Sequence, residues 1–150
     1  MVRNILLSGG AIKGVVNHLA FLAAYDVMIS KEPSELYIYG TSAGSLVGSL
    51  YAKYGGGHIE EMIEDLRDIF SYWNFIRSIK YQGNPLKTNI SILKHDIFRK
   101  KLNEKLPKQF SDLKHPFGCY AVDVTVGKSV YCGSDYPTLS VGDAVFASML

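Results

Sequence analysis

Short apolar runs alternate with longer apolar stretches of helical length along the first part of the chain. Residues 2–7 and 36–39 are apolar, aromatic or β-branched runs, a composition typical of buried strands. Each run is followed by a glycine-containing turn and then by a predicted helix, at 13–25 and at 45–54, the second ending at Gly55. Because the strand–turn–helix order repeats from the start, the pattern predicts an α/β fold.

The middle of the chain predicts a long amphipathic helix. Apolar side chains recur at helical spacing after Gly57, with acidic residues between them. The apolar set is expected to face the core, and the acidic set is expected to face solvent. The apolar positions are Ile59, Met62, Ile63, Leu66, Phe70 and Trp73, and the acidic positions are Glu60, Glu61, Glu64, Asp65 and Asp68.

Three further patterns predict packing. Apolar and polar side chains tend to alternate along residues 117–132, and several of these residues are β-branched. This pattern favours a hairpin that turns at 127–128. Small residues recur every four positions along the predicted helix 45–54 and at the residue just before it. We expect this stripe to allow the helix to pack closely against its neighbours. The apolar residues of the first helix are expected to be well buried. The stripe is Gly44, Gly48 and Ala52, and the first-helix residues are Val15, Val16, Leu19, Phe21 and Leu22.

Composition and charge narrow the class of protein. Hydrophobic residues make up 47% of the 150 residues, as in a globular chain and unlike a disordered one. The net charge of +2 is too small to indicate a nucleic-acid partner. The chain enters a strand at once and has no apolar run near the ~20 residues that span a bilayer, so we expect a cytoplasmic protein with free thiols at Cys119 and Cys132.

The most specific chemistry lies in the pentapeptide Gly40-Thr41-Ser42-Ala43-Gly44. A Gly-x-Ser-x-Gly pattern between a strand and a helix predicts a nucleophile elbow. In such an elbow the serine occupies a strained turn, and its hydroxyl is held toward the substrate. Glycines on both sides allow backbone and substrate to approach closely. Ser42 is therefore the candidate nucleophile for acyl transfer.

A second glycine-rich turn precedes the elbow in the chain. It consists of Gly9, Gly10 and Ala11, followed by Lys13 and Gly14, and it connects the first strand to the first helix. Small residues leave their backbone N–H groups uncovered, and a tetrahedral intermediate needs such donors for its oxyanion. Gly9, Gly10 and Ala11 are thus the candidate oxyanion hole.

The two turns, together with the segment Asp143-Ala144-Val145-Phe146-Ala147-Ser148, resemble the patatin-like phospholipase family. The resemblance runs from residue 5 to 150 and is weakest between about 58 and 115, and Ala11 stands where the family most often has glycine. It implies a three-layer α/β/α sandwich, of which residues 1–150 form the N-terminal portion of a single domain, incomplete at the C-terminal side. It also implies hydrolysis of acyl esters of phospholipids or other acyl lipids, with no metal and no organic cofactor.

The resemblance implies a Ser–Asp dyad whose aspartate lies in an Asp-Gly motif, and no Asp-Gly dipeptide occurs in the chain. The aspartates Asp96, Asp123, Asp135 and Asp143 lack that context. Asp143 falls in the first turn of a predicted helix, where it favours the helix dipole. We therefore expect the catalytic aspartate to lie beyond this chain, and residues 1–150 alone to be inactive.

Two other functions remain open at this point. The chain is a lipid-binding or regulatory protein without turnover if no Asp-Gly motif belongs to it, and a general α/β-hydrolase esterase if a downstream histidine supplies the base. His18 lies one helical turn past Gly14 and is interpreted as a packing or hydrogen-bonding residue. Cysteine and histidine spacing indicates no metal site.

Two segments and one side chain are candidates for contact with lipid. Residues 72–81 mix aromatic, aliphatic and cationic side chains, and residues 94–108 hold six cations against two acids, so both segments are candidates for peripheral membrane contact. The competing interpretations are core closure for the first and a solvated basic face for the second. Lys13 either steadies a phosphate or carboxylate of the substrate or pairs with an acidic side chain to support the loop.

Overall fold

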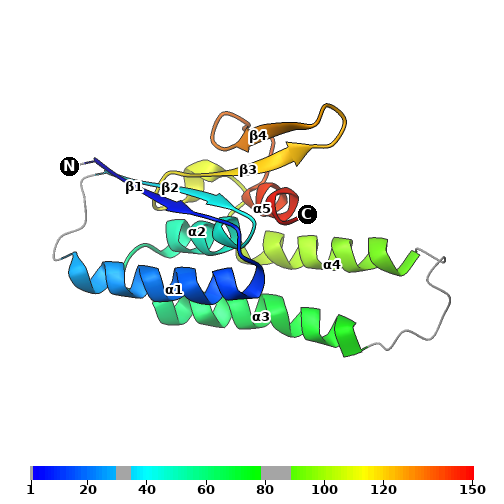
Figure 1. Ribbon diagram of the computed structural model, residues 1–150, viewed down its shortest axis with the longest axis horizontal. Helices are drawn as coiled ribbons and strands as arrows, with labels where there is room; N and C mark the ends of the chain where they lie inside the picture. The colour runs from blue at the N-terminus through cyan, green and yellow to red at the C-terminus, as the bar shows by residue number, and fades with distance from the viewer. Residues whose placement is uncertain (1, 30–34, 79–88) are drawn as a thin grey trace.

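The computed structural model describes residues 2–29, 35–78 and 89–150, and the side chains of these residues except 72–78 and 89–95. Its centre is a four-stranded sheet in the order β1–β2–β3–β4 (Figure 1). The strands β1, β2 and β3 run parallel, and β4 pairs antiparallel with β3. The strands are β1 (Val2–Leu7), β2 (Glu35–Thr41), β3 (Phe117–Asp123) and β4 (Lys128–Cys132).

Five α-helices occur in the described part of the chain. One of them connects the first two parallel strands and three lie between the second and the third, and the mixed sheet with its helices confirms the α/β class. None of these helices is long and apolar enough to cross a membrane. The helices are α1 (Ala11–Met28), α2 (Ala43–Tyr54), α3 (Ile59–Ser78), α4 (Asn89–Lys105) and α5 (Val141–Met149), with a short 3₁₀ turn at Phe110–Asp112.

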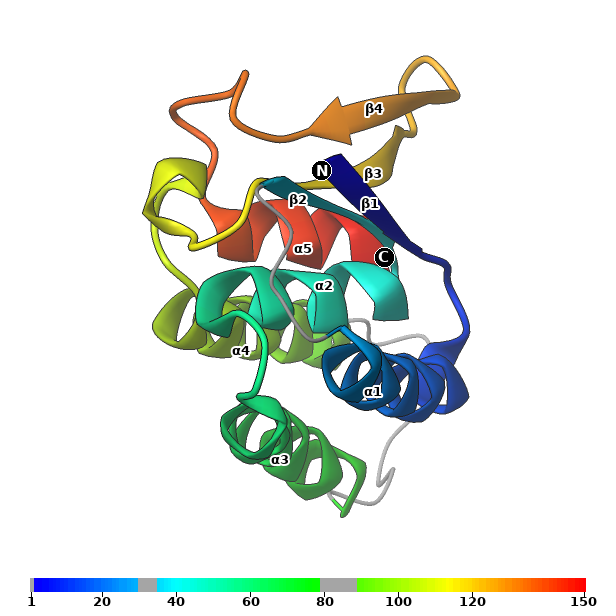
Figure 2. The same cartoon turned by 90° about the vertical axis from the view of Figure 1, so that its left-hand side faces the viewer.

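The helices lie on one side of the sheet, as Figures 1 and 2 show. Helices α2 and α5 pack against the strands, and α1, α3 and α4 lie farther out. Side chains alternate accordingly: Ile5, Ile38 and Cys119 are buried under the helices, whereas Leu6 and Val122 on the other face are exposed. The helical layer expected on that second face is not among the described residues.

Helix α2 is the centre of the core, because every residue from Ala43 to Ala52 is buried. The expected stripe of small residues lets its backbone approach the sheet closely. A methyl group at Gly44 would meet the carbonyl oxygen of Leu7, and one at Gly40 would lie 2.5 Å from the Cα of Ser45. At Gly48 a methyl group would instead lie 3.1 Å from the Cγ2 atom of Ile38, which is a side-chain contact.

Helix α1 is longer than predicted, and the expected burial of its apolar residues is partly wrong. Val15 and Leu22 are buried, but the side chains of Val16 and Phe21 are exposed. The reason is that α1 contacts α2 and α3 only on one side, so a helix that is apolar all round keeps half of its surface in solvent.

The acidic face predicted for α3 is solvated only in part. Asp65 is buried, and its Oδ2 accepts hydrogen bonds from Lys53 Nζ at 2.8 Å and from the Tyr54 hydroxyl at 2.6 Å. Lys105 of α4 adds an ion pair to Asp65 Oδ1 at 3.1 Å. Burial opposes ionisation, but these partners outweigh it and hold the pKa of the Asp65 carboxyl below its usual value. The aspartate therefore ties α2, α3 and α4 together.

The predicted hairpin is confirmed as β3 and β4. Its turn includes Gly127, whose positive φ of 65° favours glycine. Cys119 and Cys132 are directly opposed across the hairpin, and both are free and buried, as expected. Burial raises the pKa of the Cys119 thiol to about 12, which keeps it protonated.

The glycine contacts of α2 generate a paired prediction. Gly44→Ala places a methyl group against the backbone of Leu7, which no rotamer change relieves, and we expect a loss of about 3 kcal/mol or more in the free energy of unfolding. Gly48→Ala meets only the ends of side chains, and the gain in helix propensity offsets the crowding, so a change of about 1 kcal/mol or less is expected. Urea denaturation of both variants measures the difference. Equal losses would contradict the close backbone approach at Gly44.

Candidate active site

Ser42 occupies the turn between β2 and α2, where the sequence predicts the elbow. Its backbone has φ 53° and ψ −120°, a conformation that L-residues other than glycine rarely adopt. Among the described residues other than glycine, only Ser42 and Ala11 have positive φ. Strain is therefore concentrated in the two turns that the sequence singles out.

The carbonyl of Ser42 holds the first turn of α2. Its oxygen accepts hydrogen bonds from the backbone N–H groups of Ser45 at 2.9 Å and Leu46 at 3.2 Å. The hydroxyl of Ser45 also donates to it at 2.6 Å. With the carbonyl fixed on the helix and the side chain partly exposed, the Ser42 hydroxyl stands at the N-terminus of α2, where the helix dipole favours negative charge.

The glycine-rich turn lies beside Ser42. A Cβ atom built on Gly9 would be 3.6 Å from the Cβ atom of Ser42, and one built on Gly14 would be 3.1 Å from the Cβ atom of Ala43. The turns that follow β1 and β2 therefore meet at the same edge of the sheet. They meet there because β1 and β2 are parallel and in register, with Leu7 opposite Gly40.

The turn itself is held by local hydrogen bonds. The N–H of Gly14 donates to the carbonyl of Gly10 at 2.8 Å, which begins α1. His18 Nε2 lies 2.7 Å from the carbonyl oxygen of Ser8 and must carry a proton to donate to it. No hydrogen bond to a described residue occupies the N–H groups of Gly9, Gly10 or Ala11. His18 thus has the hydrogen-bonding role expected from the sequence.

The structure adds Ser148 to the site, a residue that sequence reasoning did not assign to it. Ser42 donates its backbone N–H to Ser148 Oγ at 3.0 Å, and Ser148 donates its hydroxyl proton to the carbonyl of Tyr120 at 2.6 Å. One hydroxyl on α5 therefore connects the strained turn to strand β3. The sequence offered a clue, because Ser148 ends the segment that carries the resemblance, but its contact with Ser42 spans 106 positions.

None of the described carboxylates hydrogen-bonds to the Ser42 hydroxyl. Asp123 accepts from the backbone N–H of Thr125 at 2.8 Å within the hairpin. Asp143, in the first turn of α5, forms an ion pair with Arg99. Asp96 and Asp135 make no hydrogen bond or ion pair with a described residue. Within the described ranges, histidine, cysteine and acidic side chains also form no cluster of three that would hold a metal ion.

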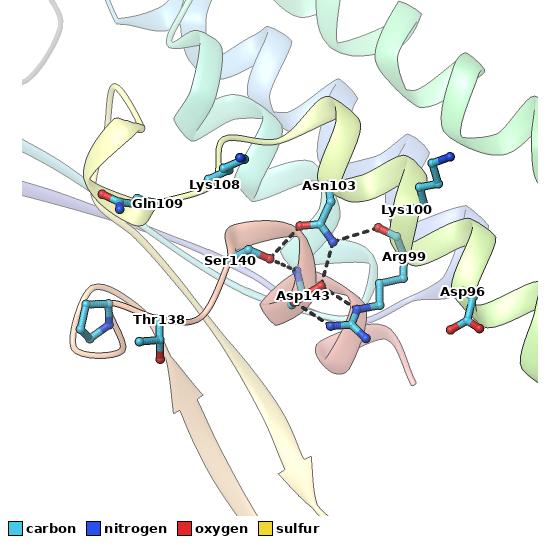
Figure 3. Close-up of a pocket in the computed structure, with 10 residues that line it drawn as sticks. Asp96, Arg99, Lys100, Asn103, Lys108, Gln109, Thr138, Ser140 and Asp143 are labelled. Carbon is cyan, nitrogen blue, oxygen red and sulfur yellow. Dashed lines mark hydrogen bonds and ion pairs between the residues drawn. The ribbon is translucent and has the colours of Figure 1, made fainter.

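Asp143 belongs to a network in a pocket of about 610 Å³ (Figure 3). Arg99 donates to both of its oxygens, at 2.7 and 2.8 Å, and Asn103 Nδ2 donates to Oδ1 at 2.7 Å. Ser140 caps α5 by accepting the Asp143 N–H at 3.0 Å. None of the predicted site residues lines this pocket, and Asp143 is held at a helix start, as the sequence indicates.

The predicted lipid contacts fall on different kinds of surface. Lys13 is exposed and has no ion pair with a described residue. In the basic segment, by contrast, Arg99, Lys100, Lys101 and Lys105 all form ion pairs with carboxylates of the protein, for example Lys105 with Asp68 at 2.8 Å. The side chains of 72–81 lie outside the described residues.

Comparison with known proteins supports the resemblance. A family model described as patatin-like phospholipase matches residues 5–150. The comparison with curated proteins gives no match to the chain.

The Arg99–Asp143 network generates a prediction on pH. The hydrogen bonds from Arg99 outweigh burial and hold the pKa of Asp143 at about 2, below its value in the unfolded chain. Its contribution is therefore complete above about pH 4 and is lost as the pH falls toward 2. For this partly exposed pair we expect Asp143→Asn to lower the free energy of unfolding by about 1–2 kcal/mol near neutral pH, and by little near pH 2.

The measurement is urea unfolding of the wild type and the variant from neutral to acidic pH. Asp96→Asn is the matched control, because Asp96 lines the same pocket without a hydrogen bond or ion pair to Arg99. A loss for Asp143→Asn that stays constant down to pH 2 would contradict the assignment.

Proposed function

Because the chain belongs to the patatin-like phospholipase family, we propose that it hydrolyses acyl esters of phospholipids or related lipids with Ser42 as nucleophile. The family is one of lipid acyl hydrolases, and lipids are the substrates it implies. The strained backbone of Ser42, with φ 53°, is the observation that supports its assignment as the nucleophile. Strain of this kind persists only where surrounding contacts enforce it, and it is concentrated at functional sites.

In the proposed reaction, Ser42 Oγ attacks the ester carbonyl carbon while a general base takes the hydroxyl proton. The carbonyl π electrons move to its oxygen and form a tetrahedral oxyanion, which the N–H groups of Gly9, Gly10 and Ala11 bind. None of these N–H groups hydrogen-bonds to a described residue, and this supports the role. The intermediate then expels the alcohol, which receives the proton, and water hydrolyses the acyl ester left on Ser42.

The base of the proposed Ser–Asp dyad is an aspartate outside residues 1–150. The support is chemical: none of the described carboxylates hydrogen-bonds to the Ser42 hydroxyl, and Asp143 is occupied by Arg99 and Asn103. The same observation favours a second candidate function, a lipid-binding or regulatory protein of the same family that binds acyl chains without turnover. Cytoplasmic location stays a prediction from the sequence.

Ser148 is proposed as a positioning residue for Ser42. Its hydroxyl is the only partner of the Ser42 N–H in the described structure, and Tyr120 fixes the direction of that hydroxyl. This arrangement supports the idea that α5 sets the orientation of the nucleophile. Gly14 would support the loop by packing on Ala43. Lys13, which forms no ion pair with a described residue, would place its charge beside a substrate phosphate or carboxylate.

Labelling with a fluorophosphonate tests the proposed nucleophile, since attack of Ser42 Oγ on phosphorus releases fluoride and leaves a stable adduct. We expect labelling when residues 1–150 are continued to the stop codon of their gene, complete loss in Ser42→Ala, and no change in Ser129→Ala, an exposed serine of β4. Residues 1–150 alone are expected to label weakly or not at all. If neither protein labels while both are folded, the lipid-binding alternative is the better account.

The same assay tests Ser148. Ser148→Ala removes the acceptor of the Ser42 N–H, and we expect the rate constant of labelling to fall about 10- to 100-fold, as small displacements of a nucleophile do. Ser148→Thr keeps the hydroxyl and should restore most of the rate. A residue with a merely structural role would lower the melting temperature without changing the rate of the folded protein, and that result would contradict the positioning role.

A further inference from the structure

We propose that the outward face of α1 is the surface on which the protein docks to an anionic phospholipid bilayer. The face is defined by the exposed residues of α1 from Ile12 onward. Seven of them are apolar: Ile12, Val16, Ala20, Phe21, Ala24, Val27 and Met28, and the other two are Lys13 and Asn17. Large exposed fractions, such as 61% for Val16 and 87% for Val27, show that the described structure leaves this face uncovered.

The apolar character of this face is unusual for a helix surface that is exposed to solvent. Helix α1 already buries Val15 and Leu22 on its inner side, so its outer side is not required for the core that the structure describes. A surface helix ordinarily carries charged and polar residues on the side away from the core. Contiguous exposed apolar residues of this kind indicate contact with another apolar phase.

Charge identifies the occupant as an anionic surface. The only charged residue on the face is Lys13, a cation. Asp26, the single acid of α1, is turned inward, where it accepts hydrogen bonds from the Tyr51 hydroxyl at 2.5 Å and the Gly57 N–H at 2.9 Å. An apolar stripe without exposed acid, next to a cation, suits the boundary between acyl chains and anionic head groups.

The dimensions favour a bilayer over a protein partner. An 18-residue helix is about 27 Å long and about 10 Å wide, so the footprint of this face is a few hundred Å². Each partner in a stable protein complex contributes roughly 800 Å². A bilayer has no such threshold, because an interfacial helix gains stability from each apolar side chain that it inserts.

The face is also continuous with the candidate active site. Ile12 directly follows Ala11, and Gly9 of the same turn lies beside Ser42. Figure 2 looks nearly along α1, with α2 and α3 on one side of it and the opposite side open. A bilayer on this face would bring lipid esters to the mouth of the glycine-rich turn, and this part of the inference rests on the proposed lipid substrate. The basic segment of α4 suits the role less well, because its described cations, Arg99, Lys100, Lys101 and Lys105, already pair within the protein.

The test uses a matched pair of double variants. Val16→Glu with Val27→Glu changes the proposed face, and Val124→Glu with Val126→Glu makes the same two substitutions in the β3–β4 turn at nearly equal exposure, 89% and 61%. All proteins carry Ser42→Ala so that no lipid is hydrolysed. Binding is measured by co-sedimentation with vesicles of phosphatidylcholine alone, and of phosphatidylcholine mixed with phosphatidylglycerol.

We expect the α1 double variant to lose at least 10-fold in affinity for the mixed vesicles, the control to stay within about 2-fold, and phosphatidylcholine alone to bind all proteins more weakly. Equal binding by both variants overturns the inference. So does a wild-type dimer that dissociates in the α1 variant without vesicle binding, because the occupant is then a second copy.

Fluorophosphonate labelling separates this inference from the proposed function. In the protein continued to the stop codon of its gene, which is the one expected to label, the α1 double variant with Ser42 intact should label like the wild type. If the protein is labelled but its binding to vesicles does not depend on the α1 face, the docking surface is overturned and the proposed hydrolase activity stands. Absent labelling together with binding that depends on the face would overturn the hydrolase and keep the docking surface.

Discussion

The close contact between helix α2 and the ends of β1 and β2 is the constraint on which the rest of the structure depends. Gly40 and Gly44 allow backbone to touch backbone there, and no side chain fits between them. Because the helix begins at that distance, the chain must reverse within one residue, and Ser42 takes a positive φ. The same contact brings Gly9 beside Ser42, so packing and candidate chemistry have one origin.

Much of the fold could be predicted from sequence because its pattern is local. The strand before each glycine turn, the hairpin turning at Gly127 and the small-residue stripe of α2 depend on neighbours within a few positions, and the structure has all three. The burial of Asp65 and the exposure of Val16 could not be predicted in this way. Both depend on which helix lies opposite, namely α4 for the aspartate and no described element for the valine.

The candidate site likewise has a part that local sequence predicts and a part that depends on tertiary contacts. Ser42 and the glycine-rich turn follow from short motifs in a strand–turn–helix context. Ser148 does not, since the segment that it ends gives no sign of a contact 106 positions away, and only the tertiary structure shows what its hydroxyl does. Helix α5 in fact serves two purposes: Ser148 at its end touches the elbow, while Asp143 at its start is fixed to α4 by Arg99.

The hydrogen bond between Ser42 and Ser148 also bears on the order in which the candidate site forms during synthesis. Its two residues are 106 positions apart, so the elbow emerges from the ribosome long before the hydroxyl that holds it. Closing so long a loop is entropically costly and comes late in folding, after the local β–turn–α units have formed. The nascent chain therefore carries the Gly-x-Ser-x-Gly turn before Ser148 is available to accept the Ser42 N–H, and docking of α5 completes the candidate site.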